Sequence, residues 1–242
     1  MQEKSKPVDN LRADAEKIIM RAIAAVLPDA TVERALKGKT FLGRVCLVAA
    51  GKAAWQMAHA ARACLQDNFC GGVVVTKYGH VKDEIANVAC FEGGHPVPDE
   101  NSLRGTDAAL ALTEDLTESG TVVFLLSGGG SALFEKPLLS LAELQDVTNQ
   151  LLAAGADIVE INTIRKRLSA VKGGRFARHC APAQVFAVVL SDILGDPLDM
   201  IASGPAYPDS SSCAQALDIA KRYGLRLSER QMMLAQKPVF YL

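Results

Sequence analysis

Five short runs of apolar residues set the strongest limit on how this chain can fold. The runs are RVCLVAA (44–50), GGVVVTK (71–77), NVACFEGG (87–94), TVVFLL (121–126) and AQVFAVVL (183–190). A strand with one face in water alternates apolar and polar residues, whereas a strand covered on both faces reads as a continuous apolar run. The runs therefore predict strands that are buried on both faces.

Segments with helical spacing separate most of these runs. We expect helices over about 11–27, shortly after Thr31, over about 52–66, from Asn101 or Ser102 to about 118, from a Ser140–Glu143 capping box to about 154, from Asp157 to about 171, and over about 214–223. Strands that alternate with helices predict an α/β fold of three layers, α/β/α, around a largely parallel, Rossmann-like sheet. We expect residues 1–242 to form a single domain of this kind.

Composition argues against several classes of partner. The net charge is −1 and aromatic residues make up 5%, so neither nucleic acid nor an anionic membrane is an expected partner. No apolar run approaches the ~20 residues of a membrane-spanning helix, and the first twenty residues do not resemble a signal peptide. The six cysteines form no C-x-x-C pair, which favours free thiols, most of them buried, in a cytoplasmic protein. The sequence is also compatible with a homo-oligomer.

A glycine-rich loop follows the fourth run, in the segment FLLSGGGSALFEKP. Ligands of parallel α/β sheets bind at the carboxyl ends of the strands, where loops turn into helices. The loop residues are Ser127, Gly128, Gly129, Gly130 and Ser131. Successive N–H groups and two hydroxyls there predict a binding site for phosphate or carboxylate, and the alternative is a tight structural turn. The loop matches neither the Walker A motif nor the G-x-G-x-x-G dinucleotide motif.

Cationic side chains occur in two other segments. Lys52 comes just after the first run, at the start of an expected helix, where the helix dipole disfavours a cation. This local misfit favours a role in anion binding, and a solvated lysine at a helix start is the alternative. On a continuous helix, Arg165, Ser169 and Lys172 share one face, and Lys172 precedes a Gly-Gly break from which it can turn toward a ligand. We therefore expect Lys52, Arg165 and Lys172 to contact an anion. The alternative is a solvated basic face, which we expect for the neighbouring cations, Lys166, Arg167, Arg175 and Arg178.

Two further side chains are candidates for the site. Asp192 follows the fifth run directly, in LSDILGDPLDMIASGP, and a carboxylate beside a phosphate loop suits Mg²⁺ or a hydroxyl proton. Turn and cap chemistry is the alternative. His95 lies in the loop GGHPVPDE, and contact with substrate or packing within the loop explains it equally well.

Taken together, these segments resemble the glycerate 2-kinase family. The resemblance rests on LLSGGGSALF, INTIRKRLSAVKGGRFA, LSDILGDPLDMIASGP, VAAGKAAWQMA and EGGHPVPDENS, and it extends over about residues 11–225. Members of this family, which is of the MOFRL type, also carry the name putative hydroxypyruvate reductase.

The resemblance implies a kinase that uses ATP and Mg²⁺ to phosphorylate D-glycerate to 2-phosphoglycerate. It places Lys52, Arg165 and Asp192 in catalysis, with Asp192 at the metal. It also places the Ser127–Ser131 loop, Lys172 and His95 at substrate or phosphate. Family members have a second, C-terminal domain on the other side of the cleft, which these 242 residues do not include, so activity of this chain alone is open. A hydroxypyruvate reductase and an anion-binding domain without turnover remain alternatives.

Overall fold

A five-stranded, all-parallel sheet lies at the centre of the computed structural model, which describes all residues except 1–7, 66, 192, 194 and 240–242. The strands are β1 (Val45–Ala50), β2 (Phe69–Lys77), β3 (Val88–Gly93), β4 (Thr121–Leu126) and β5 (Gln184–Val189). Their order across the sheet is β3-β2-β1-β4-β5. Every residue of β1 and β4 is buried, as their uninterrupted apolar sequences predict, because these strands lie in the middle of the sheet.

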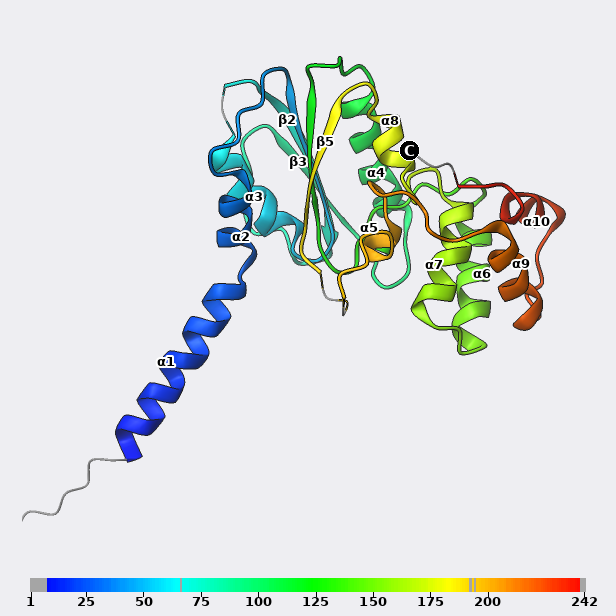
Figure 1. The fold of residues 1–242 in the computed structure, drawn as a ribbon, viewed down its shortest axis with the longest axis horizontal. Coiled ribbons are helices and arrows are strands. Elements are labelled where there is room, and N and C mark those ends of the chain that lie inside the picture. Colours follow the sequence, from blue (N-terminus) through cyan, green and yellow to red (C-terminus); the bar gives the residue numbers. More distant parts are fainter. Residues whose placement is uncertain (1–7, 66, 192, 194, 240–242) are drawn as a thin grey trace, which may run out of the picture.

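Helices cover both faces of the sheet, and a further group of helices lies beside it (Figure 1). The helices are α1 (Val8–Val26), α2 (Pro28–Leu36), α3 (Ala54–Cys64), α4 (Glu100–Thr113), α5 (Gly130–Leu133), α6 (Leu141–Ala153), α7 (Ile158–Leu168), α8 (Arg175–His179), α9 (Cys213–Arg222) and α10 (Glu229–Ala235), with a 3-10 turn, η1, at Ile201–Ser203. The three-layer α/β/α prediction is confirmed.

Three hydrophobic clusters follow from this arrangement. One joins α2 and α3 to a face of the sheet, and a second joins α4 and α8 to the other face. A third cluster lies among α6, α7 and α9 and includes the fully buried Leu144, Val147 and Leu151. The third cluster holds α7 against α6 and α9, and α7 carries Arg165.

The amino terminus of the described chain is a projecting helix. In Figure 1, α1 points away from the rest of the molecule, and residues 10–27 are all exposed. The exposed side chains include large apolar ones, such as Ile18, Ile19 and Met20. No helix in the described part of the chain is long and apolar enough to cross a membrane.

Several of the expected helices have different bounds in the structure: α2 begins at Pro28, before Thr31, and α4 ends at Thr113 instead of about 118. The helix α4 begins at Glu100 because Asp99, rather than Asn101 or Ser102, caps it and accepts a hydrogen bond from the Ser102 N–H. The helix α7 ends at Leu168 instead of continuing to about 171. Its end is set by Ser169, which is extended and forms an antiparallel bridge with Pro137.

Candidate active site

The loops that follow β1 and β4 lie side by side because the two strands are neighbours. The Lys52 N–H donates to the carbonyl of Gly128 at 2.9 Å, and the Ser127 hydroxyl accepts from the Ala53 N–H at 3.0 Å. A methyl group placed on Gly51 would lie 2.3 Å from the Ser127 hydroxyl oxygen. The two loops therefore form one unit, in which Ser127 is buried and joins the loops instead of facing a ligand.

The glycine loop turns sharply into the short helix α5. Gly129 has φ +87°, a conformation that L residues rarely adopt. Among the described residues, the N–H groups of Gly128, Gly129 and Ser131 have no hydrogen-bond acceptor. Unpaired N–H groups at such a turn form a concave site for an anion.

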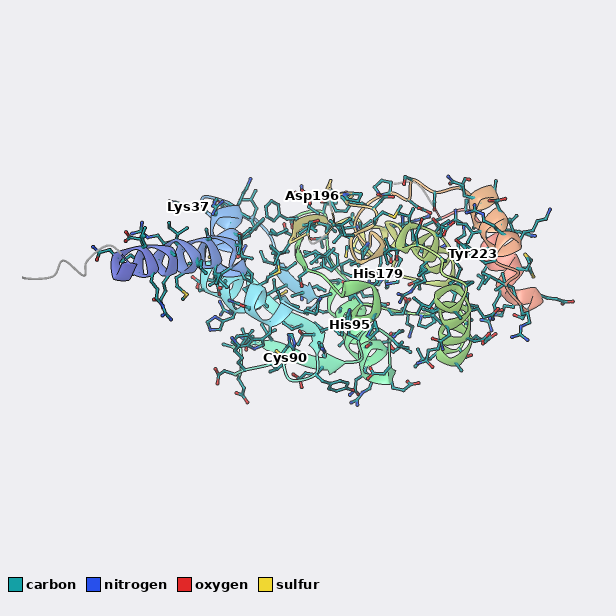
Figure 2. The ribbon with its side chains drawn as sticks, turned by 90° about the horizontal axis from the view of Figure 1, so that it is seen from below. Lys37, Cys90, His95, His179, Asp196 and Tyr223 are labelled. Carbon is teal, nitrogen blue, oxygen red and sulfur yellow. The ribbon has the colours of Figure 1, made fainter. Side chains whose placement is uncertain are left out.

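Lys52 and His95 both lie close to this loop. A methyl group on Gly129 would lie 2.9 Å from His95 Cδ2 and 3.2 Å from Lys52 Cγ. His95 comes from the loop after β3, and Figure 2 shows it near the middle of the molecule. The side chain of Lys52 is exposed. Only a residue without a side chain at position 129 leaves room for both groups beside the loop.

A cavity of about 340 Å³ opens beside these groups. His95, Gly128, Gly129 and Ser131 line one side, and Arg165 and Ala202 line other parts of its wall. Four candidates from different parts of the sequence thus meet at one cavity: the glycine loop, His95, Arg165 and, close to Gly129, Lys52.

Arg165 and Lys172 share a buried carboxylate. The Glu135 side chain is fully buried, and its Oε2 lies 3.4 Å from both Arg165 Nη2 and Lys172 Nζ. Arg165 Nη2 also donates to the carbonyl of Ser131 at 2.8 Å, as does Lys172 Nζ at 2.8 Å. Two cations and one carboxylate leave one positive charge directly behind the glycine loop, and this charge favours an anion in the cavity.

Lys172 differs from its predicted geometry. Because α7 ends at Leu168, Lys172 is not on the same helix face as Arg165, and the prediction that it can turn toward a ligand is wrong. Its ammonium is fully buried and donates to the carbonyls of Ser131 and Phe134. Burial lowers the pKa of Lys172 from 10.5 to about 8. Lys172 therefore supports α5 from behind and acts on the cavity through its charge.

Two of the neighbouring cations, Lys166 and Arg167, are not solvated, contrary to expectation, whereas Arg175 is half-buried and Arg178 is exposed as expected. Lys166 is fully buried and lies 3.0 Å from Asp209 and 3.2 Å from Asp199. Arg167 is 1% exposed and contacts Asp209 at 3.4 Å. Here two cations face two carboxylates, so this cluster is balanced in charge and holds α7 to Asp199 before η1 and to Asp209 after it.

Sequence reasoning assigned no role to Glu135 or to the turn that carries Ala202. Ala202 and Ser203 have φ of +52° and +62°, which is strained for residues with a side chain. The Ser203 hydroxyl lies 2.9 Å from that of Ser131 and donates to Asn162 Oδ1 at 2.9 Å. This chain of hydrogen bonds fixes the turn against the glycine loop. The serine-glycine-proline sequence of the turn was the available signal.

Asp192, the predicted metal ligand, lies outside the described residues. Its neighbour Ile193 lines the cavity. Among the described residues, no group of three or more histidine, cysteine, aspartate or glutamate side chains could hold a metal ion. Magnesium at kinase sites takes one or two carboxylates plus substrate phosphates, so it does not require such a group.

Residues 14–235 match the family described as a domain of unknown function, DUF4147. The chain belongs to the DUF4147 family. A D-glycerate 2-kinase from Thermotoga maritima is 52% identical over 95% of this chain and 56% of its own length. A putative hydroxypyruvate reductase from Agrobacterium vitis is 40% identical over 88% of this chain and 49% of its own length.

A solved structure agrees with this placement. The crystal structure of a glycerate kinase from Thermotoga maritima matches the DUF4147 chain with a TM-score of 0.89 at 51% identity, over 95% of this chain and 56% of that one. The chain thus spans about half the length of the curated relatives it matches. The resemblance to the glycerate 2-kinase family that its motifs indicate is confirmed.

Proposed function

We propose that this chain provides the anion-binding side of the active site of an ATP-dependent D-glycerate 2-kinase. The observation that carries the proposal is the cavity, where the free N–H groups of the glycine loop meet Arg165 and the excess positive charge behind it. The 52% identity to a D-glycerate 2-kinase supports the substrate. The volume of the cavity, about 340 Å³, is at the small end for ligand pockets. This volume favours a three-carbon acid and one phosphoryl group over a whole nucleotide.

Phosphoryl transfer depends mainly on positioning and on neutralising charge. The 2-hydroxyl oxygen of glycerate forms a bond to the γ-phosphorus of ATP while the bond from that phosphorus to the β,γ-bridging oxygen breaks. ADP leaves, and the hydroxyl proton is released to solvent. We assign Gly128, Gly129 and Ser131 N–H groups to a phosphoryl or carboxylate oxygen. Arg165 lines the cavity with one guanidinium edge held by Ser131 and Glu135, so its position is fixed before the substrate arrives.

Lys52 and His95 complete the proposed site. The exposed ammonium of Lys52 neutralises the charge that develops on the transferred group, and His95 contacts the substrate beside Gly129. We assign Mg²⁺ to Asp192 and the phosphates of ATP, since Asp192 follows the strand that ends next to the cavity. The location in the cytoplasm and a homo-oligomeric state stay predictions.

A hydroxypyruvate reductase is the second candidate, because a relative at 40% identity carries that name. Hydride transfer from a nicotinamide cofactor requires a dinucleotide site, and the glycine loop lacks the G-x-G-x-x-G spacing. NADH oxidation that depends on hydroxypyruvate would favour this candidate over the kinase.

The test has two arms. In the first, a full-length relative is assayed for ADP release with D-glycerate and MgATP, and the equivalent of Lys52→Ala should lower kcat by at least tenfold. The control is the equivalent of Lys37, an exposed lysine at the end of α2 that Figure 2 shows well apart from His95. An unchanged kcat in the Lys52 variant would remove Lys52 from the mechanism.

In the second arm, this chain itself is titrated with D-glycerate and with phosphate while its thermal midpoint is measured. Saturable stabilisation that is lost in Arg165→Gln supports binding at the cavity. Stabilisation without any ADP release from this chain identifies it as an anion-binding domain without turnover. Absence of stabilisation by either anion would contradict the proposed site.

A further inference from the structure

Two cysteines from neighbouring strands meet at the end of the sheet opposite the cavity. The sulfur atoms of Cys46 on β1 and Cys70 on β2 lie 2.7 Å apart, well inside ordinary contact and not far from the S–S bond length of about 2.05 Å. Cys70 Sγ also lies 3.2 Å from the carbonyl of Val45, and Cys46 Sγ lies 3.7 Å from that of Leu112. Both thiols are free.

A bulge in β2 creates this contact. Val45 pairs with Phe69, but the next residue, Cys46, pairs with Gly71, so Cys70 is an extra residue without a partner in β1. Such bulges redirect a side chain relative to the regular pleat. Gly71 follows with φ +147°, which favours glycine and lets the strand resume its register. The sequence itself encodes the meeting of the two thiols in the pair Cys70-Gly71.

The two thiols differ in accessibility. Cys70 is exposed, whereas Cys46 is fully buried. Burial, with a further contribution from Cys70, raises the pKa of the Cys46 thiol from 9.0 to about 12. A dithiol is strongly oxidising when its reduced form is stabilised, for example as a thiolate. The Cys46 thiolate is not stabilised in this way, so a disulfide at this position should resist reduction. The buried partner makes the reaction slow and its product stable.

We propose that Cys46 and Cys70 form a thiol–disulfide exchange site that reacts with small-molecule disulfides. Cys70, as its thiolate, attacks one sulfur of the small disulfide, forms a mixed disulfide and releases one small thiol. Cys46 then loses its proton, attacks the Cys70 sulfur and expels the second small thiol. Two protein thiols and one disulfide thus become one protein disulfide and two small thiols, with no other oxidant.

The Cys46–Cys70 bond would join β1 to β2 and close a loop of chain that contains α3. The two cysteines are 24 positions apart, and closing a loop of this size restricts the unfolded chain. The oxidised protein is therefore expected to unfold at a higher temperature. The bond lies at the amino ends of the strands, so ligand binding at their carboxyl ends should not change.

The full chain is incubated with oxidised glutathione at mildly alkaline pH for hours, and then its mass and linked peptides are measured. The expected result is the loss of two hydrogens, a peptide link between Cys46 and Cys70, and a thermal midpoint several degrees higher that dithiothreitol reverses. The Cys64→Ser variant, which lacks a different exposed thiol, should behave as the wild type.

Two variants separate the steps of the proposed exchange. Cys46→Ser should retain glutathione on Cys70 and show no rise in thermal midpoint. Cys70→Ser should form no link. Because this substitution is at the surface and leaves the buried Cys46 in place, it serves as the comparison if Cys46→Ser does not fold. A stable glutathione adduct on Cys70 in the wild type with Cys46 still free, or a link from either cysteine to Cys180, would overturn the proposal.

Discussion

Replacing Lys172 by methionine should remove a pH-dependent contribution to stability. Burial lowers the pKa of this ammonium from 10.5 to about 8, although the Glu135 carboxylate beside it opposes the shift. In the unfolded chain the lysine titrates near its ordinary value. Between these two pH values the unfolded chain binds a proton that the folded protein does not bind. The free energy of unfolding therefore rises with pH over this interval.

The magnitude follows from the two pKa values. Their separation, 10.5 minus about 8, corresponds to roughly 3 kcal/mol. Relative to pH 7, the stability of the wild type minus that of Lys172→Met should be greater by about 1 kcal/mol at pH 9 and by about 2–3 kcal/mol at pH 10. Below about pH 7 the lysine is almost fully protonated in both states, and the difference should be constant.

Urea unfolding between pH 7 and pH 10 measures this difference directly. Lys136→Met is the matched control, because Lys136 adjoins Glu135 in the sequence but pairs with Asp107 at the surface. The difference between the wild type and this control should not change with pH. A flat or falling curve for Lys172→Met would refute the reasoning, since it would mean that the pairing with Glu135 outweighs burial and keeps the folded lysine protonated.

Three further predictions address the glycine loop, the balanced ion cluster and the projecting helix. Gly129→Ala and Gly155→Ala both place a side chain at positive φ, and each should lower the free energy of unfolding by about 1–2 kcal/mol in urea unfolding. Only Gly129→Ala should weaken phosphate binding, because its methyl group also contacts His95 and Lys52. Asp209→Asn should cost about 3–5 kcal/mol by leaving buried cations short of a partner, whereas Asp218→Asn at an exposed pair should leave the thermal midpoint unchanged. Deletion of the chain up to residue 24 should also leave the midpoint of the remaining chain unchanged, because residues 10–24 are all exposed.

The sheet was predictable from sequence because its signal is local. An uninterrupted apolar run such as TVVFLL specifies a buried strand wherever the strand lies in the sheet. The position of the glycine loop followed from the same signal, since a loop after a buried parallel strand lies at the edge where ligands bind. The capping box at Ser140 and Glu143 was equally local and is present.

The environment of the cations was not predictable because their partners are distant in sequence. Lys172 contacts Glu135, and Lys166 contacts Asp209, across 37 and 43 positions. A basic segment read alone suggests a solvated face, and only the fold brings the buried carboxylates to it. The Cys46–Cys70 contact has the same origin, since it depends on a bulge that shifts the register of β2 by one residue.

The position of Lys172 links ligand binding to protonation. Arg165 and Lys172 both donate hydrogen bonds to the carbonyl of Ser131, on the side of the glycine loop away from the cavity. The N–H groups of the loop remain available to an anion in the cavity. An anion bound at those N–H groups would favour the charged form of Lys172 and raise its pKa above about 8. By linkage, loss of that proton must weaken anion binding to the same extent. A lysine buried behind the glycine loop would thus influence how strongly the loop binds an anion. Glu135 pairs with both cations and so limits how much of their charge acts on the cavity.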